Sequence, residues 1–348
     1  MPTFEHEYLS SVGQAMLAAV GTPEEIARRV SDGLVGANLA GHDSHGVIRL
    51  TGYLDQVDQK IVAVTERPQV VRETPATAVL DARRGWGHFA ADRGMALAIE
   101  KARTTGLGAV ALLRINHAGR MGEYVEAAAR AGCVGMLFAG LGGRDVGCAA
   151  PLGGRGRYLG SNPIAVGIPC GDGPPFVLDF ATTVAARGKI QVAQSRGSQL
   201  PEGWIVDAQG RASVRPEDFF SGGSLLHFGG HKGYALSLMT CAVGGLSGAF
   251  QAEHARIGGI FLIAINVEAF QPLDVYQANV RRFLDTIKEA GRASADQEIL
   301  TPGEPEWRSR QARLAEGIEL PEKVWNTITD AASKRGAVLP VAGTSTRV

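Results

Sequence analysis

A buried strand, a glycine-bearing turn and a helix follow one another in residues 108–131, and the turn is the feature that most constrains the fold. This order often builds an anion or cofactor site, because amides at a helix N-terminus bind negative charge. The pattern G-x-G-x-x-G of ordinary dinucleotide-binding folds is absent. Residues 140–142 and 154–156 each supply the first two glycines of this pattern. The position of the third glycine is occupied by Asp145 in the first case and by Leu159 in the second. An ordinary doubly wound dinucleotide fold is therefore not supported, and there is no P-loop.

The rest of the chain has enough apolar sequence for a large α/β core. The chain has 348 residues, enough for two or three domains, and 45% of them are apolar. The 46 glycines are dispersed, which favours tight turns and close backbone approaches. Extended segments or strands are predicted at 68–82, 108–115, 133–141, 164–169, 175–180 and 259–266. Helices are predicted at 4–19, at 23–39 with Thr22 as N-cap, and at 90–105, 122–131, 273–290 and 321–335.

Charge and cysteine content exclude several classes of function. Lys+Arg and Asp+Glu balance at 35 each without a basic block, so no nucleic-acid partner is expected. The cysteines lack CxxC spacing, which favours buried thiols in a reducing compartment over disulfides or a zinc knuckle. Residues 1–6 carry an acid and no apolar run, so no signal peptide is evident. We predict a soluble, cytoplasmic protein.

One uncharged segment, residues 233–252, imitates a membrane span. It contains Ser237, Thr240, Ser247 and several glycines, and it ends beside Glu253. We predict a buried interdomain helix here and no membrane partner.

Residues 41–49 gather a hydroxyl, an imidazole and a guanidinium within a short polar run. His45 can give or take a proton near neutral pH, and Ser44 lies beside it. The Arg49 side chain offers a planar fork that matches a carboxylate. A helix resuming near Val47 places Arg49 and Tyr53 on one face. A polar run between two helices is also commonly a solvated turn, so both interpretations stay open.

Three further polar turns are compatible with anion binding. Residues 116–122 connect a strand to a helix, residues 179–183 precede Arg187 and Lys189, and residues 228–234 open the uncharged segment. Helix N-termini and basic side chains suit phosphate groups. Each turn is equally compatible with an ordinary connection that carries surface charge.

Taken in order, these motifs resemble the type 2 malate/L-lactate dehydrogenase family, which includes ureidoglycolate, sulfolactate and hydroxycarboxylate dehydrogenases and some imine reductases. The resemblance runs from Thr22 to about Gly317 and is closest to the hydroxycarboxylate branch, through residues 38–46 and 231–236. It implies an α/β fold with a non-Rossmann NAD(P)-binding domain and a helical domain built from N- and C-terminal segments. The implied parts are an N-terminal helical segment with the catalytic motif (1–70), a small α/β segment (71–118), the NAD(P)-binding domain (119–270), and C-terminal helices packing back on the N-terminal segment (271–348).

The resemblance also implies roles for residues at matching positions. His45 matches the proton donor and acceptor, Ser44 precedes it in a relay, and Arg49 matches the group that grips the substrate carboxylate. His117 lines the site, and Asp179 is a candidate third relay member or cofactor ligand. Besides His45, the implied cofactor-binding residues are Gly119, Arg120, Met121, Asp179, Phe180, Ala181, Thr182, Thr183, His231, Lys232, Asn266, Gly303, Glu304, Pro305 and Glu306; no metal ligand is implied.

The implied reaction is reversible hydride transfer between a 2-hydroxy acid and NAD or NADP, with NAD favoured, in a homodimer whose site lies near a subunit contact. His45 would protonate the developing alkoxide. Three positions depart from the family pattern and bear on cofactor details: Glu123 replaces a common aromatic, Ser161 replaces a common threonine, and Pro305 lacks a backbone donor.

Other functions remain compatible with the sequence. His42, Asp43 and His45 lie close together, and His227 and His231 are four residues apart, so a metal-dependent hydrolase is one alternative. The others are an NADPH-dependent cyclic imine reductase on the same fold and a binding relative without activity. Neither the acid used nor the choice between NAD and NADP follows from the sequence.

Overall fold

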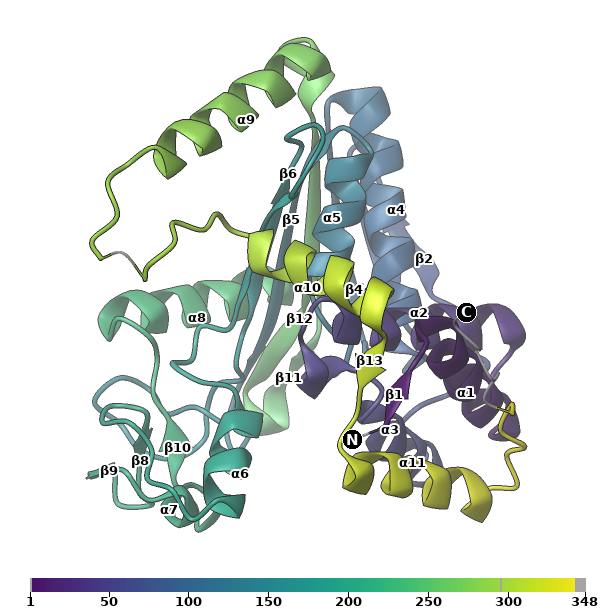
Figure 1. Cartoon of the computed structure of the whole chain (residues 1–348), viewed down its shortest axis with the longest axis vertical. Helices are drawn as coiled ribbons and strands as arrows, with labels where there is room; N and C mark the ends of the chain where they lie inside the picture. The colour runs from purple at the N-terminus through teal and green to yellow at the C-terminus, as the bar shows by residue number, and fades with distance from the viewer. Residues whose placement is uncertain (1, 295, 342–348) are drawn as a thin grey trace.

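The computed structural model describes residues 2–294 and 296–341, and one eight-stranded sheet runs through its centre (Figure 1). The strand order is β2 (Gln69–Glu73), β3 (Thr77–Asp81), β4 (Leu107–Leu113), β12 (Arg256–Asn266), β5 (Cys133–Gly142), β6 (Ile164–Ile168) and β7 (Phe176–Phe180), with β11 (Phe250–Gln251) pairing β12. Within this sheet β3 and β4 pair in parallel and the other pairs are antiparallel. This order differs from a doubly wound parallel sheet, as the missing glycine pattern predicted.

Helices cover both faces of the sheet. α4 (Gly87–Thr105) and α5 (Gly122–Arg130) lie on one face, and α8 (His231–Gly244) lies on the other (Figure 1). Two glycines of β5 permit the close approach. A Cβ at Gly135 would lie 2.5 Å from the Ala128 side chain on α5, and one at Gly140 would lie 2.3 Å from the Thr240 carbonyl on α8. A bulkier residue at either position would push a helix off the sheet.

A helical layer joins the two ends of the chain. It contains α1 (His6–Ala19), α2 (Glu24–Leu39), α3 (Arg49–Asp58) and α11 (Glu322–Lys334). Buried side chains such as Leu34, Leu54 and Ile328 share one apolar core. β1 (Thr3–Phe4) pairs antiparallel with β13 (Ile318–Glu319), and α10 (Glu304–Glu316) lies against α2. The predicted helical domain of N- and C-terminal segments is thereby confirmed, while the finer four-part division stays a prediction.

A smaller unit extends from the other side of the sheet. It contains α6 (Arg187–Ser195), β8 (Ile205–Val206), β9 (Ala212–Ser213), α7 (Pro216–Phe220) and β10 (Ser224–Leu225). Its buried side chains, among them Ile190, Phe219 and Leu225, share an apolar core with Cys241 of α8. α9 (Leu273–Lys288) stands away from the body (Figure 1), and Leu284 is its buried residue.

Several local expectations differ from the structure. Residues 68–82 form two strands, β2 and β3, and α10 was not predicted. The Thr22 hydroxyl does not cap α2, because it accepts a hydrogen bond from the indole Nε1 of Trp86 at 3.2 Å.

The uncharged segment is not one buried helix, because α8 ends at Gly244 and a 3-10 turn (Gly245–Ser247) follows. α8 packs its small residues against the sheet and leaves Leu238 44% exposed. Among the described residues, no helix combines the length and apolar content that crossing a membrane requires.

Candidate active site

The run 41–49 forms a tight loop between α2 and α3 that includes a 3-10 turn, Asp43–His45. Asn38, at the end of α2, holds both sides of the loop. Its Oδ1 accepts the Val47 amide at 2.9 Å, and its Nδ2 donates to Asp43 Oδ1 at 2.7 Å. Arg313 of α10 adds hydrogen bonds to both Asp43 oxygens and to the Asn38 carbonyl. The loop is therefore anchored by side chains and is not a loosely solvated turn.

This loop presents Ser44, His45 and Arg49 together. Ser44 Oγ lies 3.1 Å from His45 Nδ1, and Arg49 Nε donates to the Ser44 carbonyl at 2.6 Å. Arg49 is exposed, and its two terminal nitrogens have no hydrogen-bond partner in the described part of the chain. A guanidinium fixed at Nε and open at its ends can bind a carboxylate through two parallel hydrogen bonds.

His117 lies directly beside His45. The two rings stack with their centroids 5.6 Å apart and an angle of 20° between their planes. His117 Nδ1 lies 2.6 Å from the hydroxyl of Tyr53, which α3 contributes one turn after Arg49. Behind them, the buried His88 meets the Tyr53 ring edge-on at 5.8 Å. Two segments distant in sequence thus meet in one imidazole cluster.

Both imidazoles are poised as neutral groups. Burial and the charge of Arg49 lower the pKa of His45 to about 4, with smaller effects from His42 and Arg120. The protein atoms packed around the ring, then Arg49 and His45, lower the pKa of His117 to about 3, although the residue is also exposed on one side. Strong displacement of pKa in a cluster of this kind is typical of catalytic sites.

Asp179, at the end of β7, lies near this cluster without joining the relay. Its Oδ2 accepts the Gly122 amide at 2.7 Å, and among the described residues no hydrogen bond links it to Ser44 or His45. Burial raises the pKa of Asp179, while the Gly122 amide, Arg120 and His42 act against that effect. Its carboxylate instead fixes the start of α5.

The other predicted residues of this region surround Asp179. Arg120 is buried, donates to Glu126 Oε1 at 2.8 Å, and leaves its Nε without a partner in the described structure. Met121 is buried beside it. Gly119 has a φ of +73°, and a Cβ there would lie 2.3 Å from His88 Nε2, so the turn requires glycine.

The segment after β7 meets the start of α8. The Phe180 ring packs edge-on against Phe228 at 5.3 Å, and the Thr182 carbonyl accepts the Phe228 amide at 3.2 Å. The hydroxyls of Thr182 and Thr183 donate to the carbonyls of Ser161 and Ala185, so both are engaged within the fold. The structure thus brings the predicted segments 179–183, including Ala181, and 231–232 to one region, where His231 and Lys232 are exposed.

The predicted residues 303–306 open α10. Gly303 has a φ of +89°, and the Glu304 carboxylate is buried against Lys288 and Arg308 at 2.8 and 2.6 Å. Pro305 occupies the first turn of the helix, and Glu306 Oε1 lies 3.1 Å from His42 Nε2. Any contact of Glu304 with a ligand must therefore come from its main chain.

Asn266 is not brought to this region. Its amide donates to the Gly106 carbonyl beyond the C-terminal end of α4, and its Oδ1 accepts the Glu268 amide. His88 lies at the opposite end of α4, a helix of 19 residues and hence roughly 28 Å long.

The described residues do not contain a group of three or more His, Cys, Asp or Glu side chains arranged to hold a metal ion. His231 begins α8 while His227 precedes it in an extended bridge with Thr183, so their spacing does not place both on one helical face. The geometry gives the hydrolase alternative no support.

Comparison with known proteins identifies the family. The model of the malate/L-lactate dehydrogenase family matches residues 4–329. The chain belongs to this family. Among relatives, the malate dehydrogenase of Pyrococcus abyssi is 37% identical over 336 residues, covering 92% of this chain and 91% of the relative. The hydroxycarboxylate dehydrogenase B of Escherichia coli is 36% identical over 344 residues, covering 96% and 94%.

Two solved structures share the fold over nearly the whole chain. The malate dehydrogenase from Entamoeba histolytica superposes with a TM-score of 0.90 at 30% identity, covering 98% of this chain and 99% of that one. The Δ1-piperideine-2-carboxylate reductase from Pseudomonas syringae superposes with a TM-score of 0.84 at 28% identity, covering 95% and 100%. The predicted family and α/β fold are confirmed.

The sequence does not reveal the groups that anchor the loop of residues 41–49. Asn38 was part of the recognised motif, and a buried amide at the end of an apolar stripe is the signal that could have revealed it. Arg313 gave no such signal, because it is 270 residues from Asp43. Tyr53 lies beside the motif, but no sequence pattern gives it a role.

Proposed function

We propose that this chain is an NAD(P)-dependent dehydrogenase that interconverts a 2-hydroxy acid and its 2-oxo acid. The cluster of His45, Arg49 and His117 carries this proposal, since it combines a proton-transfer group with an open carboxylate clamp. The names of the malate and hydroxycarboxylate dehydrogenases to which the chain is similar support it.

In the proposed reaction, Arg49 binds the substrate carboxylate and orients the carbonyl or hydroxyl group toward His45. For reduction, His45 gives a proton to the carbonyl oxygen; for oxidation, it removes the proton of the hydroxyl. Ser44 fixes the ring through Nδ1. Burial is the largest cause of the lowered pKa of His45, and the charge of Arg49 is the second; a bound carboxylate offsets that charge, so substrate binding raises this pKa by removing the second cause.

The polar groups around the cluster fit a nicotinamide dinucleotide. Arg120 has an unpartnered buried Nε, and Lys232 is exposed at the N-terminus of α8, after two glycines with positive φ. Cationic side chains and helix amides suit a pyrophosphate. We propose that residues 119–121, 179–183, 231–232 and 303–306 hold the cofactor. When bound, its dihydronicotinamide supplies the hydride.

A substrate panel tests the reaction. Aromatic, malate-like and sulfonated 2-oxo acids and a cyclic imine acid are assayed with NADH and with NADPH, and we expect NADH-dependent reduction of a 2-oxo acid. His45→Ala should lower turnover by about a hundredfold or more, whereas His6→Ala, a surface control, should not. Arg49→Lys should mainly raise the KM of the acid, because the fork is lost.

Near wild-type turnover in His45→Ala would remove this residue from proton transfer. Nucleotide binding without turnover of any substrate would instead favour a binding relative without activity.

A cyclic imine reductase is the second candidate. The similarity to the Δ1-piperideine-2-carboxylate reductase favours it. Such a substrate also offers a carboxylate to Arg49, and His45 would then protonate nitrogen instead of oxygen. Preference for the cyclic imine acid over every 2-oxo acid in the panel would select this function.

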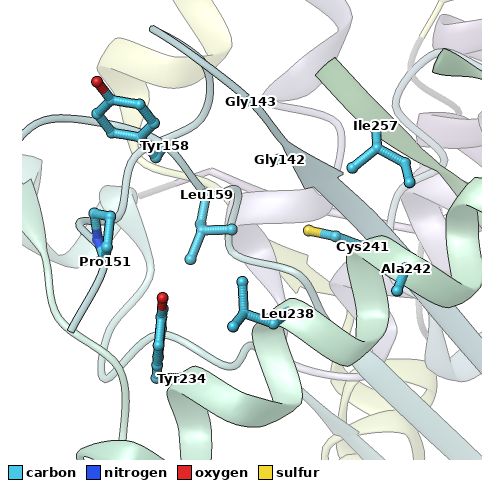
Figure 2. A pocket seen from close by; sticks show the side chains of 10 residues that line it. All are labelled: Gly142, Gly143, Pro151, Tyr158, Leu159, Tyr234, Leu238, Cys241, Ala242 and Ile257. Carbon is cyan, nitrogen blue, oxygen red and sulfur yellow. The ribbon is translucent and has the colours of Figure 1, made fainter. Parts of the chain in front are cut away.

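We also propose a homodimer in the cytoplasm. An apolar pocket of about 300 Å³ lies between α8 and the end of β5 (Figure 2), lined in part by Tyr158, Leu159 and Leu238. Leu246, in the 3-10 turn that follows α8, is 61% exposed, and these exposed apolar side chains support contact with a second copy. Leu238→Glu should halve the mass in sedimentation, while Val71→Glu, on exposed β2, should not.

The four unpaired cysteines support a reducing compartment, which cell fractionation tests.

A further inference from the structure

Tyr53 touches the imidazole cluster, but the proposed reaction gives it no role. Its side chain is 4% exposed, and its hydroxyl lies 2.6 Å from His117 Nδ1. The ring contacts the rings of Trp86 and His88, each with its centroid 5.8 Å away. A buried phenol packed against two rings keeps its hydroxyl in one place.

A second contact fixes the direction of this hydrogen bond. The Gly119 amide points at the same His117 Nδ1, at 3.4 Å. A backbone N–H can only donate, so Nδ1 must offer its lone pair. The Tyr53 hydroxyl then donates as well, and burial, which raises the pKa of Tyr53, keeps its proton in place. If Nδ1 carried the hydrogen instead, its N–H would face the N–H of Gly119, and two donors would oppose each other.

With Nδ1 as acceptor, the ring hydrogen of neutral His117 lies on Nε2. In the described structure this nitrogen has no hydrogen-bond partner, and the residue as a whole is exposed, so a ligand can approach the ring. The stacked ring of His45 places the same space beside the proton-transfer group. An Nε2–H here can donate to a substrate oxygen, and it cannot act as a base.

We propose that Tyr53 is a positioning residue that fixes His117 as the Nε2–H tautomer, so that His117 donates a hydrogen bond to substrate and His45 alone transfers the proton. The role of His117 toward substrate rests on the proposed function, whereas its tautomer is a property of the ligand-free protein.

NMR of histidine-¹⁵N-labelled, ligand-free protein tests the tautomer, with His117→Gln to assign the signals. We expect wild-type His117 to show a protonated Nε2 and a bare Nδ1. Tyr53→Phe keeps the ring and removes the hydroxyl. Only the longer Gly119 contact, at 3.4 Å, then favours a bare Nδ1, so the Nδ1–H form should increase. Tyr124→Phe is the matched control, because that buried hydroxyl donates to the neighbouring Ala118 carbonyl and not to His117. It should leave the His117 signals unchanged.

Kinetics tests the consequence. Tyr53→Phe should lower kcat/KM for the 2-oxo acid about tenfold, the effect of losing one hydrogen bond. The same change should have little further effect in a His117→Gln background, because a glutamine amide donates without a tautomer to fix.

A wild-type His117 with Nδ1–H overturns the inference, even if Tyr53→Phe does not fold. Unchanged His117 signals in a folded Tyr53→Phe protein overturn it too. Lack of turnover with every acid would instead defeat the proposed function and leave the tautomer result standing.

Discussion

Glu304 offers a quantitative test, because the family resemblance implies that it binds the cofactor while the structure buries its carboxylate in an ion-pair cluster. It is 3% exposed and accepts hydrogen bonds from Lys288 at 2.8 and 2.9 Å, from Arg308 at 2.6 Å and from the Thr301 amide at 3.2 Å. Burial alone raises the pKa of Glu304, but these donors outweigh it and lower the pKa to about 2. We predict that Glu304→Gln weakens the fold more than nucleotide binding.

The expected magnitude follows from linkage. A carboxyl whose pKa falls from 4.5 to about 2 on folding contributes up to about 3 kcal/mol. The side chains of Lys288 and Arg308 are 34% and 45% exposed, and screening reduces this figure to about 2 kcal/mol. For a chain of this length, such a loss lowers Tm by about 3 °C. Because the folded pKa is lowered, the contribution is fully present above pH 4.5 and is lost as pH falls toward 2.

Urea unfolding at pH 7 and at lower pH measures this difference without cofactor. Glu298→Gln is the matched control, because Glu298 pairs with the same Arg308 at 2.6 Å but is 44% exposed. It should cost clearly less stability than Glu304→Gln, because solvent screens an exposed ion pair. NADH titration should give nearly the same Kd for Glu304→Gln as for wild type. Unchanged stability together with a strongly weakened Kd would refute this reasoning and make the side chain a cofactor ligand.

Three further predictions concern the loop and the start of α10. Since the pKa of His45 is about 4, kcat/KM for oxidation should stay level from neutral pH down to about pH 5. In Arg49→Gln the fall of kcat/KM at low pH should begin at a higher pH, because the charge that lowers the pKa of His45 is gone. A fall centred near pH 6.5 in the wild type would contradict this prediction. Arg313→Leu removes the anchor of Asp43, so kcat should fall about tenfold, the effect of one misplaced catalytic group; wild-type kcat would contradict it. Gly303→Ala, with φ +89° and a backbone oxygen 2.4 Å from the new Cβ, should cost about 2 kcal/mol by urea unfolding; an unchanged midpoint would contradict it.

The strands were the predictable part of the fold. β5, β6 and β7 lie within a residue or two of their expected bounds, because strands covered on both faces form continuous apolar runs. The order of the sheet was not predictable, because β12 inserts between β4 and β5 from more than a hundred residues away. Local periodicity carries no information on such pairing.

The site was predictable where its groups are adjacent in sequence. Ser44, His45 and Arg49 lie within one loop, so their chemistry was readable from the chain. The stacking of His117 on His45 depends on how α3 packs against the turn before α5, which no local pattern encodes. The proposed third relay member, Asp179, bonds the Gly122 amide instead. That contact follows from the pairing of β7 with β6 beside α5.

The contacts of α10 hold the loop of residues 41–49 in place, and their polar character explains why the sequence does not predict this helix. Its contacting face is polar: Glu306 meets His42, Ser309 donates to the Leu39 carbonyl at 3.0 Å, and Arg313 holds Asp43. These positions are three and four residues apart, the spacing of one helical face. Since apolar periodicity is the usual signal of a helix, a helix that docks through charges gives none. The same helix begins at Gly303, within the proposed cofactor segment. A ligand that shifts the start of α10 would therefore also move Arg313, which anchors Asp43 in the loop that carries His45.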